Sequence, residues 1–236
     1  MLKLSLGSIR RVLAIGAHSD DIEIGAGGTL LKLIEDIPEL EVYWAVFSAP
    51  GERVKEAYDS AKEYLRPLKN PAIKIADFQE SYFPSEWTNI KLYLEEIKKE
   101  FEPDLVFTHC REDRHQDHRV LSDLAWNAFR NHLILEYEIL KYDGDLGVPN
   151  VFFPLPERIT DRKIELLLKH FKSQATSKHW FSSSSFSALH RIRGLECVSE
   201  SGNAEAFYVR KIALGSGNEF RGRGLGISYP DDYVHL

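Results

Sequence analysis

Two short stretches of the chain concentrate side chains that bind metal ions and carry protons. The stretch AHSDD contains His18 and Asp21, and the stretch HCREDRHQDH contains His115 and His118. The members of each pair are three residues apart, and side chains at that spacing share a face in the first turn of a helix. Each pair can therefore converge on one point, and both stretches follow apolar segments that are typical of buried strands.

A zinc ion would account for this concentration of imidazoles and carboxylates. Catalytic zinc sites use about three nitrogen or oxygen ligands at roughly 2.0–2.2 Å and keep a position for water. His18, Asp21 and His118 would meet that count, although the sequence alone does not say which histidine of the second stretch binds. Asp20 is then available as a general base and His115 as an oxyanion stabiliser or proton donor. Other divalent ions accept the same ligand types.

Simpler interpretations of these residues weaken when the two stretches are considered together. A single histidine is more often packed or on the surface than bound to a metal, and an Asp pair after a strand commonly caps a helix. We exclude a nucleotide-binding turn, because the G-x-G-x-x-G spacing is absent between Gly16 and Gly28 and the acids there would repel a pyrophosphate. Both stretches lie at strand ends with little basic compensation, which favours a metal ion.

Strand and helix patterns alternate through the first half of the chain. Apolar runs predict strands at residues 11–16, 41–49, 72–78 and 104–109, and helical periodicity predicts helices at 24–37, 53–68, 87–101 and 117–133. This alternation predicts an α/β, Rossmann-like fold with a mostly parallel sheet and helices on both faces. The active site of such a sheet lies at the carboxyl ends of its strands, where both chemical stretches fall.

The second half of the chain is less regular. It predicts strands at residues 134–143, 150–155 and 204–212, a helix at 162–171, and a loop or helix cap at the serine run 182–185. Residues 213–236 are expected to form an irregular tail. Because no composition break divides the chain, we expect a single domain over residues 1–236.

The composition of the chain limits the binding partners and the cellular compartment that we expect for it. The net charge of −6 argues against nucleic acid, whose phosphates require a basic surface. Cys110 and Cys197 do not make a disulfide framework. Because neither a targeting segment nor an apolar run long enough for a membrane span is visible, we expect a cytoplasmic protein.

Larger motifs resemble those of the LmbE-like, or PIG-L, zinc-dependent deacetylase family. AHSDDIEIGAGGTL is similar to the A-H-P-D-D-E motif of that family, with Ser19 in place of the proline, and DRHQDHR is similar to its H-x-D-H motif. Weaker matches are RVKEAYDSAKEYL, which resembles an R-x-x-E helix, the pair Ser173 and Gln174, and the fragment AEAF.

The resemblance implies a zinc-dependent hydrolase that removes an N-acetyl or related acyl group from an amino-sugar derivative. It implies three zinc ligands: His18, Asp21 and His118. It also implies Asp20 as general base, His115 as oxyanion stabiliser and proton donor, Asp117 as the residue that orients His115, and Arg53 as a substrate contact.

Other functions remain compatible with these residues. An amidase acting on a thiol–sugar conjugate, or a deacylase acting on an antibiotic- or nucleotide-linked sugar, would keep the metal and change the substrate. A metal- or sugar-binding protein without catalysis is the third reading. Tyr82, Phe83, Trp87 and Trp180 can stack on a sugar or lie in the core. A homo-oligomer is also compatible with the resemblance.

Overall fold

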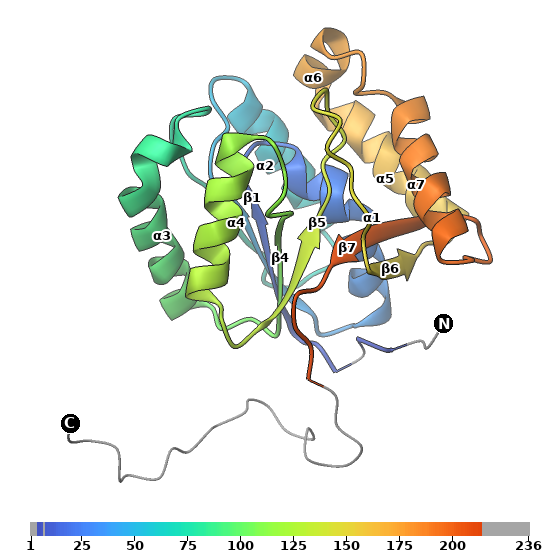
Figure 1. Ribbon diagram of the computed structural model, residues 1–236, viewed down its shortest axis with the longest axis horizontal. Helices are drawn as coiled ribbons and strands as arrows, with labels where there is room; N and C mark the ends of the chain where they lie inside the picture. The colour runs from blue at the N-terminus through green and yellow to red at the C-terminus, as the bar shows by residue number, and fades with distance from the viewer. Residues whose placement is uncertain (1–3, 7, 214–236) are drawn as a thin grey trace, which may run out of the picture.

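Five parallel strands lie side by side in a seven-stranded sheet, and two further strands continue it along one edge (Figure 1). The computed structural model describes residues 4–6 and 8–213. The parallel strands are β1 (Arg11–Gly16), β2 (Glu41–Val46), β3 (Ala72–Ile75), β4 (Leu105–His109) and β5 (Leu133–Tyr137). The sheet order is β3-β2-β1-β4-β5-β7-β6, in which β7 (Ala204–Tyr208) runs antiparallel to both β5 and β6 (Val151–Pro154).

Helices cover both faces of the sheet, as predicted (Figure 1). Their bounds are α1 (Asp21–Asp36), α2 (Arg53–Tyr64), the 3₁₀ turn η1 (Phe83–Glu86), α3 (Trp87–Glu100), α4 (Gln116–Ala128), α5 (Glu157–His170), α6 (Lys172–Ser177) and α7 (Ser183–Glu196). Successive side chains of β1 point to opposite faces of the sheet and pack against different helices. Val12 and Ala14 pack in the core under α1, α2 and α5, whereas Leu13 and Ile15 pack under α3 and α4. The mostly parallel α/β fold is confirmed.

Some predicted boundaries differ from those of the structure. The helix predicted to reach residue 133 ends at Ala128, because the apolar pattern continues into strand β5, which is buried on both faces and has no helical period. The serine run begins the 14-residue helix α7, in which Ser182 accepts a hydrogen bond from the backbone N–H of Ser185. Helix α5 begins at Glu157, directly after Pro156 and before the predicted residue 162. The predicted tail lies outside the described residues except for Ala213.

Glycine brings α1 close to the sheet at one position in particular. A Cβ atom at Gly25 would clash with the ring of Tyr137 on β5. The Tyr137 ring is fully buried, and its hydroxyl donates to the backbone carbonyl of Ile15 at 2.5 Å. The absence of a side chain at Gly25 therefore allows the helix to lie against the strand next to the candidate site.

A buried ion pair between α5 and β7 also holds this helix, near Gly28. Both carboxylate oxygens of Glu205 on β7 accept backbone N–H groups of α1, from Gly28 and Thr29, at 2.7 Å each. The ammonium of Lys163 on α5 donates to Glu205 and to the carbonyl of Ile24, also at 2.7 Å. The pair is almost fully buried, so these bonds compensate the cost of removing two charges from water. The AEAF fragment thus anchors the helix that carries Asp21.

Two further observations concern disulfide bonds and membrane-spanning helices. Both cysteines are free. Among the residues that the structure describes, no helix combines the length and the hydropathy needed to cross a membrane.

Candidate metal and catalytic site

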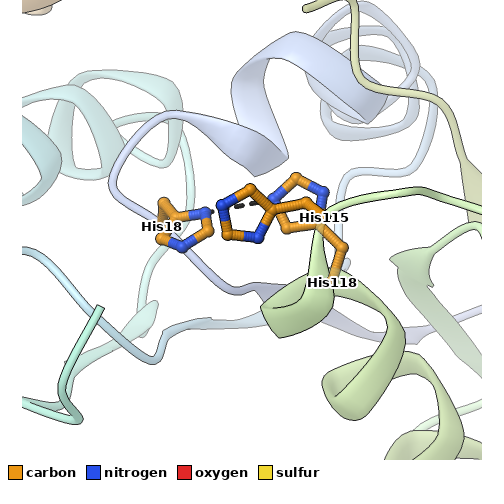
Figure 2. A group of neighbouring side chains, drawn as sticks. All are labelled: His18, His115 and His118. Carbon is orange, nitrogen blue, oxygen red and sulfur yellow. Dashed lines mark hydrogen bonds between the residues drawn. The ribbon is translucent and has the colours of Figure 1, made fainter. Parts of the chain in front are cut away.

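The two chemical stretches meet at the carboxyl ends of β1 and β4, which are neighbours in the sheet. His18 follows β1 and Asp21 is the first residue of α1, whereas His115 caps the N-terminus of α4 and His118 lies in its first turn. Figure 2 shows the three imidazoles gathered in one cluster. The chain leaves β1 toward one edge of the sheet and β4 toward the other, so the cluster lies where α/β sheets usually bind ligands.

Three ligand atoms face one another at distances that suit a metal ion. His18 Nδ1 lies 3.0 Å from His118 Nε2 and 3.3 Å from Asp21 Oδ2, and His118 Nε2 lies 3.5 Å from Asp21 Oδ2. Ligands at about 2.0–2.2 Å from one ion, at tetrahedral angles, are about 3.3–3.6 Å apart. All three side chains are buried. The two distances to Asp21 lie within this range and the distance between the two nitrogens is shorter, so the three atoms are close enough to share one metal ion.

Asp113 is a site residue that the motif comparison did not single out. Its Oδ2 accepts the Nδ1 proton of His118 at 2.9 Å and lies 3.0 Å from the ammonium of Lys141. Burial and the nearby His109 lower the pKa of His118 to about 3, so its Nε2 keeps a lone pair at neutral pH. Carboxylates that hold metal-binding histidines in this way fix the tautomer and the ring orientation. The only sequence signal was an acid five residues before His118.

His109 is a second residue of the site that was not predicted to act there. Its Nε2 lies 3.3 Å from Asp21 Oδ2, within reach of a shared ion. The same nitrogen accepts the backbone N–H of Ala17 at 2.9 Å, so its lone pair is already engaged. The ring is fully buried and stacks on His118, with the two centroids 3.9 Å apart. We therefore interpret His109 as a support for the β1–α1 loop rather than as a ligand.

The carboxylate of Asp117 contacts His18 and a neighbouring loop. Its Oδ2 lies 3.1 Å from His18 Nε2 and accepts the N–H of Ser81 at 2.6 Å, and its Oδ1 accepts the N–H of Phe83 at 3.1 Å. Among the described residues, no hydrogen bond joins this carboxylate to the side chain of His115. The resemblance implied that Asp117 orients His115, whereas in this geometry its carboxylate contacts His18.

His115 presents one ring nitrogen to the site. Its Nδ1 accepts the backbone N–H of Asp117 at 3.2 Å, as an N-cap. Burial and the neighbouring His18 lower the pKa of His115 below its ordinary value, which favours the neutral ring. Because Nδ1 is an acceptor, the proton of the neutral ring is on Nε2. Nε2 is thus a hydrogen-bond donor, and it has no partner in the part of the chain that the structure describes.

Asp20 is buried beside the ligand atoms without belonging to them. Burial and the adjacent Asp21 raise its pKa to about 7, and the nearby His18 and Arg53 partly oppose this effect. Asp20 precedes α1, but its side chain makes no capping hydrogen bond to the helix. A carboxyl group whose pKa lies near neutrality is well matched to accept a proton from water.

Arg53 lies at the start of α2 and forms an ion pair with Glu80. The other residue of the R-x-x-E fragment, Glu56, has a structural contact. It accepts the backbone N–H of Ser173 at 3.0 Å and the Ser173 hydroxyl at 2.5 Å. The R-x-x-E helix and the late serine are therefore joined across α2 and α6, which ties the helix carrying Arg53 to the second half of the chain.

The aromatic residues divide between the core and the surface. Phe83 is fully buried, and Trp180 packs on Phe181 with ring centroids 5.5 Å apart. Tyr82 and Trp87, which flank η1, are 54% and 42% exposed. Of the four aromatic residues considered for sugar stacking, Tyr82 and Trp87 are therefore the more accessible.

Comparisons with known proteins relate the chain to deacetylases. A model of the family described as "PIG-L: GlcNAc-PI de-N-acetylase" matches residues 13–129, which include both chemical stretches. An "uncharacterized deacetylase", YaiS of Escherichia coli K12, is 28% identical over 166 residues, which are 67% of this chain and 89% of that protein.

Solved structures share the fold at low sequence identity. The N,N'-diacetylchitobiose deacetylase of Pyrococcus horikoshii is 21% identical with a TM-score of 0.67, over 85% of this chain and 84% of the other. GalB of Pseudomonas putida, a 4-carboxy-2-hydroxymuconate hydratase, is 15% identical with a TM-score of 0.68, over 88% and 99% of the two chains. Because one fold serves a deacetylase and a hydratase, the reaction must be argued from the site residues.

Proposed function

The chain belongs to the PIG-L/LmbE-like deacetylase family, and on that premise we propose that it is a metal-dependent hydrolase that removes an N-acetyl or related acyl group from an amino-sugar derivative. The observation that supports this proposal best is the arrangement around three ligand atoms. His18, Asp21 and His118 place ligand atoms 3.0–3.5 Å apart, and Asp20 is buried beside them. A base separate from the ligand set is what hydrolysis of an amide requires.

Zinc, or another divalent ion with similar ligand preferences, would lower the pKa of a water and polarise the substrate carbonyl when bound. The residues of this chain supply the proton transfers. Asp20 accepts a proton from the attacking water, whose oxygen forms a bond to the acyl carbon. The Nε2–H of His115 donates a hydrogen bond to the carbonyl oxygen as negative charge develops there. The C–N bond then breaks, acetate is released, and His115 or the protonated Asp20 delivers a proton to the amine.

Acetate release tests this proposal together with the metal content of the same sample. We expect the metal-loaded protein to release acetate from N-acetylglucosamine or N,N'-diacetylchitobiose. Asp20→Asn should keep the metal stoichiometry and lower kcat at least about a hundredfold, since a positioned base contributes roughly 10²–10⁴ in rate. Asp36→Asn, at the far end of the same helix and 49% exposed in its side chain, is the matched control and should behave as wild type.

Two results would overturn the proposal. One is the failure of the metal-loaded protein to release acid from any N-acylated sugar, including thiol-, antibiotic- and nucleotide-linked ones. The other is an Asp20→Asn variant with wild-type turnover. Sugar binding without release would support the non-catalytic alternative.

A further inference from the structure

The loop between β3 and α3 is fixed to the candidate site on both sides of Glu80. Ser48 donates its hydroxyl proton to the carbonyl of Phe78 at 2.7 Å, on the N-terminal side of the loop. On the other side, the Asp117 carboxylate accepts the backbone N–H groups of Ser81 and Phe83. Because Asp117 also bonds His18, the backbone at Glu80 is tied to a candidate metal ligand and cannot move away independently of it.

Glu80 is directed at Arg53, at the start of α2. The two side chains form an ion pair and are 33% and 18% exposed. The ion pair joins Arg53 to the loop that Asp117 holds beside His18, which places both groups next to the candidate site. Arg53 makes one side-chain hydrogen bond within the described residues, to Glu80, so its other N–H groups are available to a substrate.

The charge of Lys141, a second cation beside the site, is also compensated by carboxylates. Lys141 pairs with Asp113, and it lies against Asp145 as well. Arg53 and Lys141 therefore each have a carboxylate partner already. A substrate phosphate at Arg53 would gain the fork of N–H donors that suits it, but it would also lie beside the fixed charge of Glu80.

We propose that Glu80 is a specificity-determining residue that restricts the protein to amino sugars with uncharged groups next to Arg53. This inference rests on the proposed deacetylase function and names its substrate class. The free N–H groups of Arg53 donate to neutral hydroxyl or carbonyl oxygens of the sugar. Glu80 repels a phosphate or carboxylate at the same place, so selectivity comes from a built-in repulsion as well as from attraction.

Charge selection can be measured with one neutral sugar and two of its phosphates, which carry the phosphate at different positions. The values of kcat/KM for acetate release are compared for N-acetylglucosamine, its 1-phosphate and its 6-phosphate. Wild type should prefer the neutral sugar. Glu80→Gln should raise kcat/KM for at least one phosphorylated sugar, relative to the neutral one, by about tenfold or more, because charges a few ångströms apart interact strongly in a partly buried site. Glu80→Asp keeps the charge and should keep the preference.

Glu86→Gln is the matched control, because it removes an equal charge from the same loop. Its carboxylate accepts from the Asn89 amide at 2.8 Å and has no contact with Arg53. The ratio of kcat/KM values should stay at the wild-type level in this variant. Thermal unfolding of each variant identifies any loss of folding.

The inference fails if wild type uses the neutral and phosphorylated sugars equally well, or if Glu80→Gln leaves their ratio unchanged. Failure of the proposed function looks different, because then no sugar releases acetate at all. Charge selection is tested in that case by calorimetric binding of the same three sugars to wild type and Glu80→Gln. Equal affinities for the three sugars in both proteins would overturn the inference of charge selection.

Discussion

The hydrogen bond between Asp113 and His118 allows the support of the candidate metal site to be measured directly. Asp113→Asn keeps the volume of the side chain and removes its charge. Burial opposes ionisation of Asp113, but His118, His109 and Lys141 together hold its pKa well below the ordinary range. The variant therefore replaces a charged acceptor, 2.9 Å from His118 Nδ1, with a neutral amide oxygen.

The size of the effect follows from the contacts that are lost and kept. Hydrogen bonds to charged groups contribute about 1.5–3 kcal/mol and neutral ones about 0.5–1.5 kcal/mol. Their difference, about 1–1.5 kcal/mol, corresponds to roughly a tenfold change in an equilibrium constant. Lys141 loses one partner but retains Asp145, so no buried cation is left unpaired. We therefore expect zinc affinity to fall about tenfold, at the lower end of the 10–100-fold typical of such supporting residues.

Competition with a chromophoric chelator gives the zinc affinity of each protein, independently of catalysis. Asp123→Asn, an exposed carboxylate on the same helix, is the matched control and should bind as wild type does. Unchanged affinity in Asp113→Asn would refute the supporting role. Equal weakening in both variants would indicate a general effect on α4 instead.

Two further variants test the packing and the charges around the site. Gly25→Ala should lower the free energy of unfolding by about 1–3 kcal/mol in a chemical denaturation experiment, because the new Cβ would overlap the buried ring of Tyr137; equal or higher stability would show that α1 can shift. Glu63→Gln should destabilise the protein at pH 7 by less than about 1 kcal/mol, since hydrogen bonds led by Lys169 lower the pKa of Glu63 from 4.5 to about 2. The stabilisation is present above the unfolded pKa, so the difference from wild type should disappear as the pH falls from about 4.5 to about 2; a difference that persists at pH 2 would contradict this assignment.

The sequence by itself determined the fold class and the composition of the two chemical stretches. Apolar runs and helical periodicity are local properties, so strands β1 to β4 and helices α1 to α3 could be predicted close to their observed positions. The three-residue spacings of His18 with Asp21 and of His115 with His118 are local too. Boundaries were less predictable where a buried strand continued the apolar pattern of a helix, as at residues 129–133.

Only the tertiary structure decided how these groups are used. The order of the strands places β4 beside β1, which brings residues about a hundred positions apart within 3.0 Å at His18 and His118. Side-chain direction turns Asp117 toward His18 and the Ser81 loop, and long-range packing sets Asp113 beside Lys141 and Glu80 beside Arg53. These contacts join segments that are far apart in the sequence, so no local pattern of residue spacing predicts them. The orientation of each side chain also depends on neighbours that only the folded chain supplies.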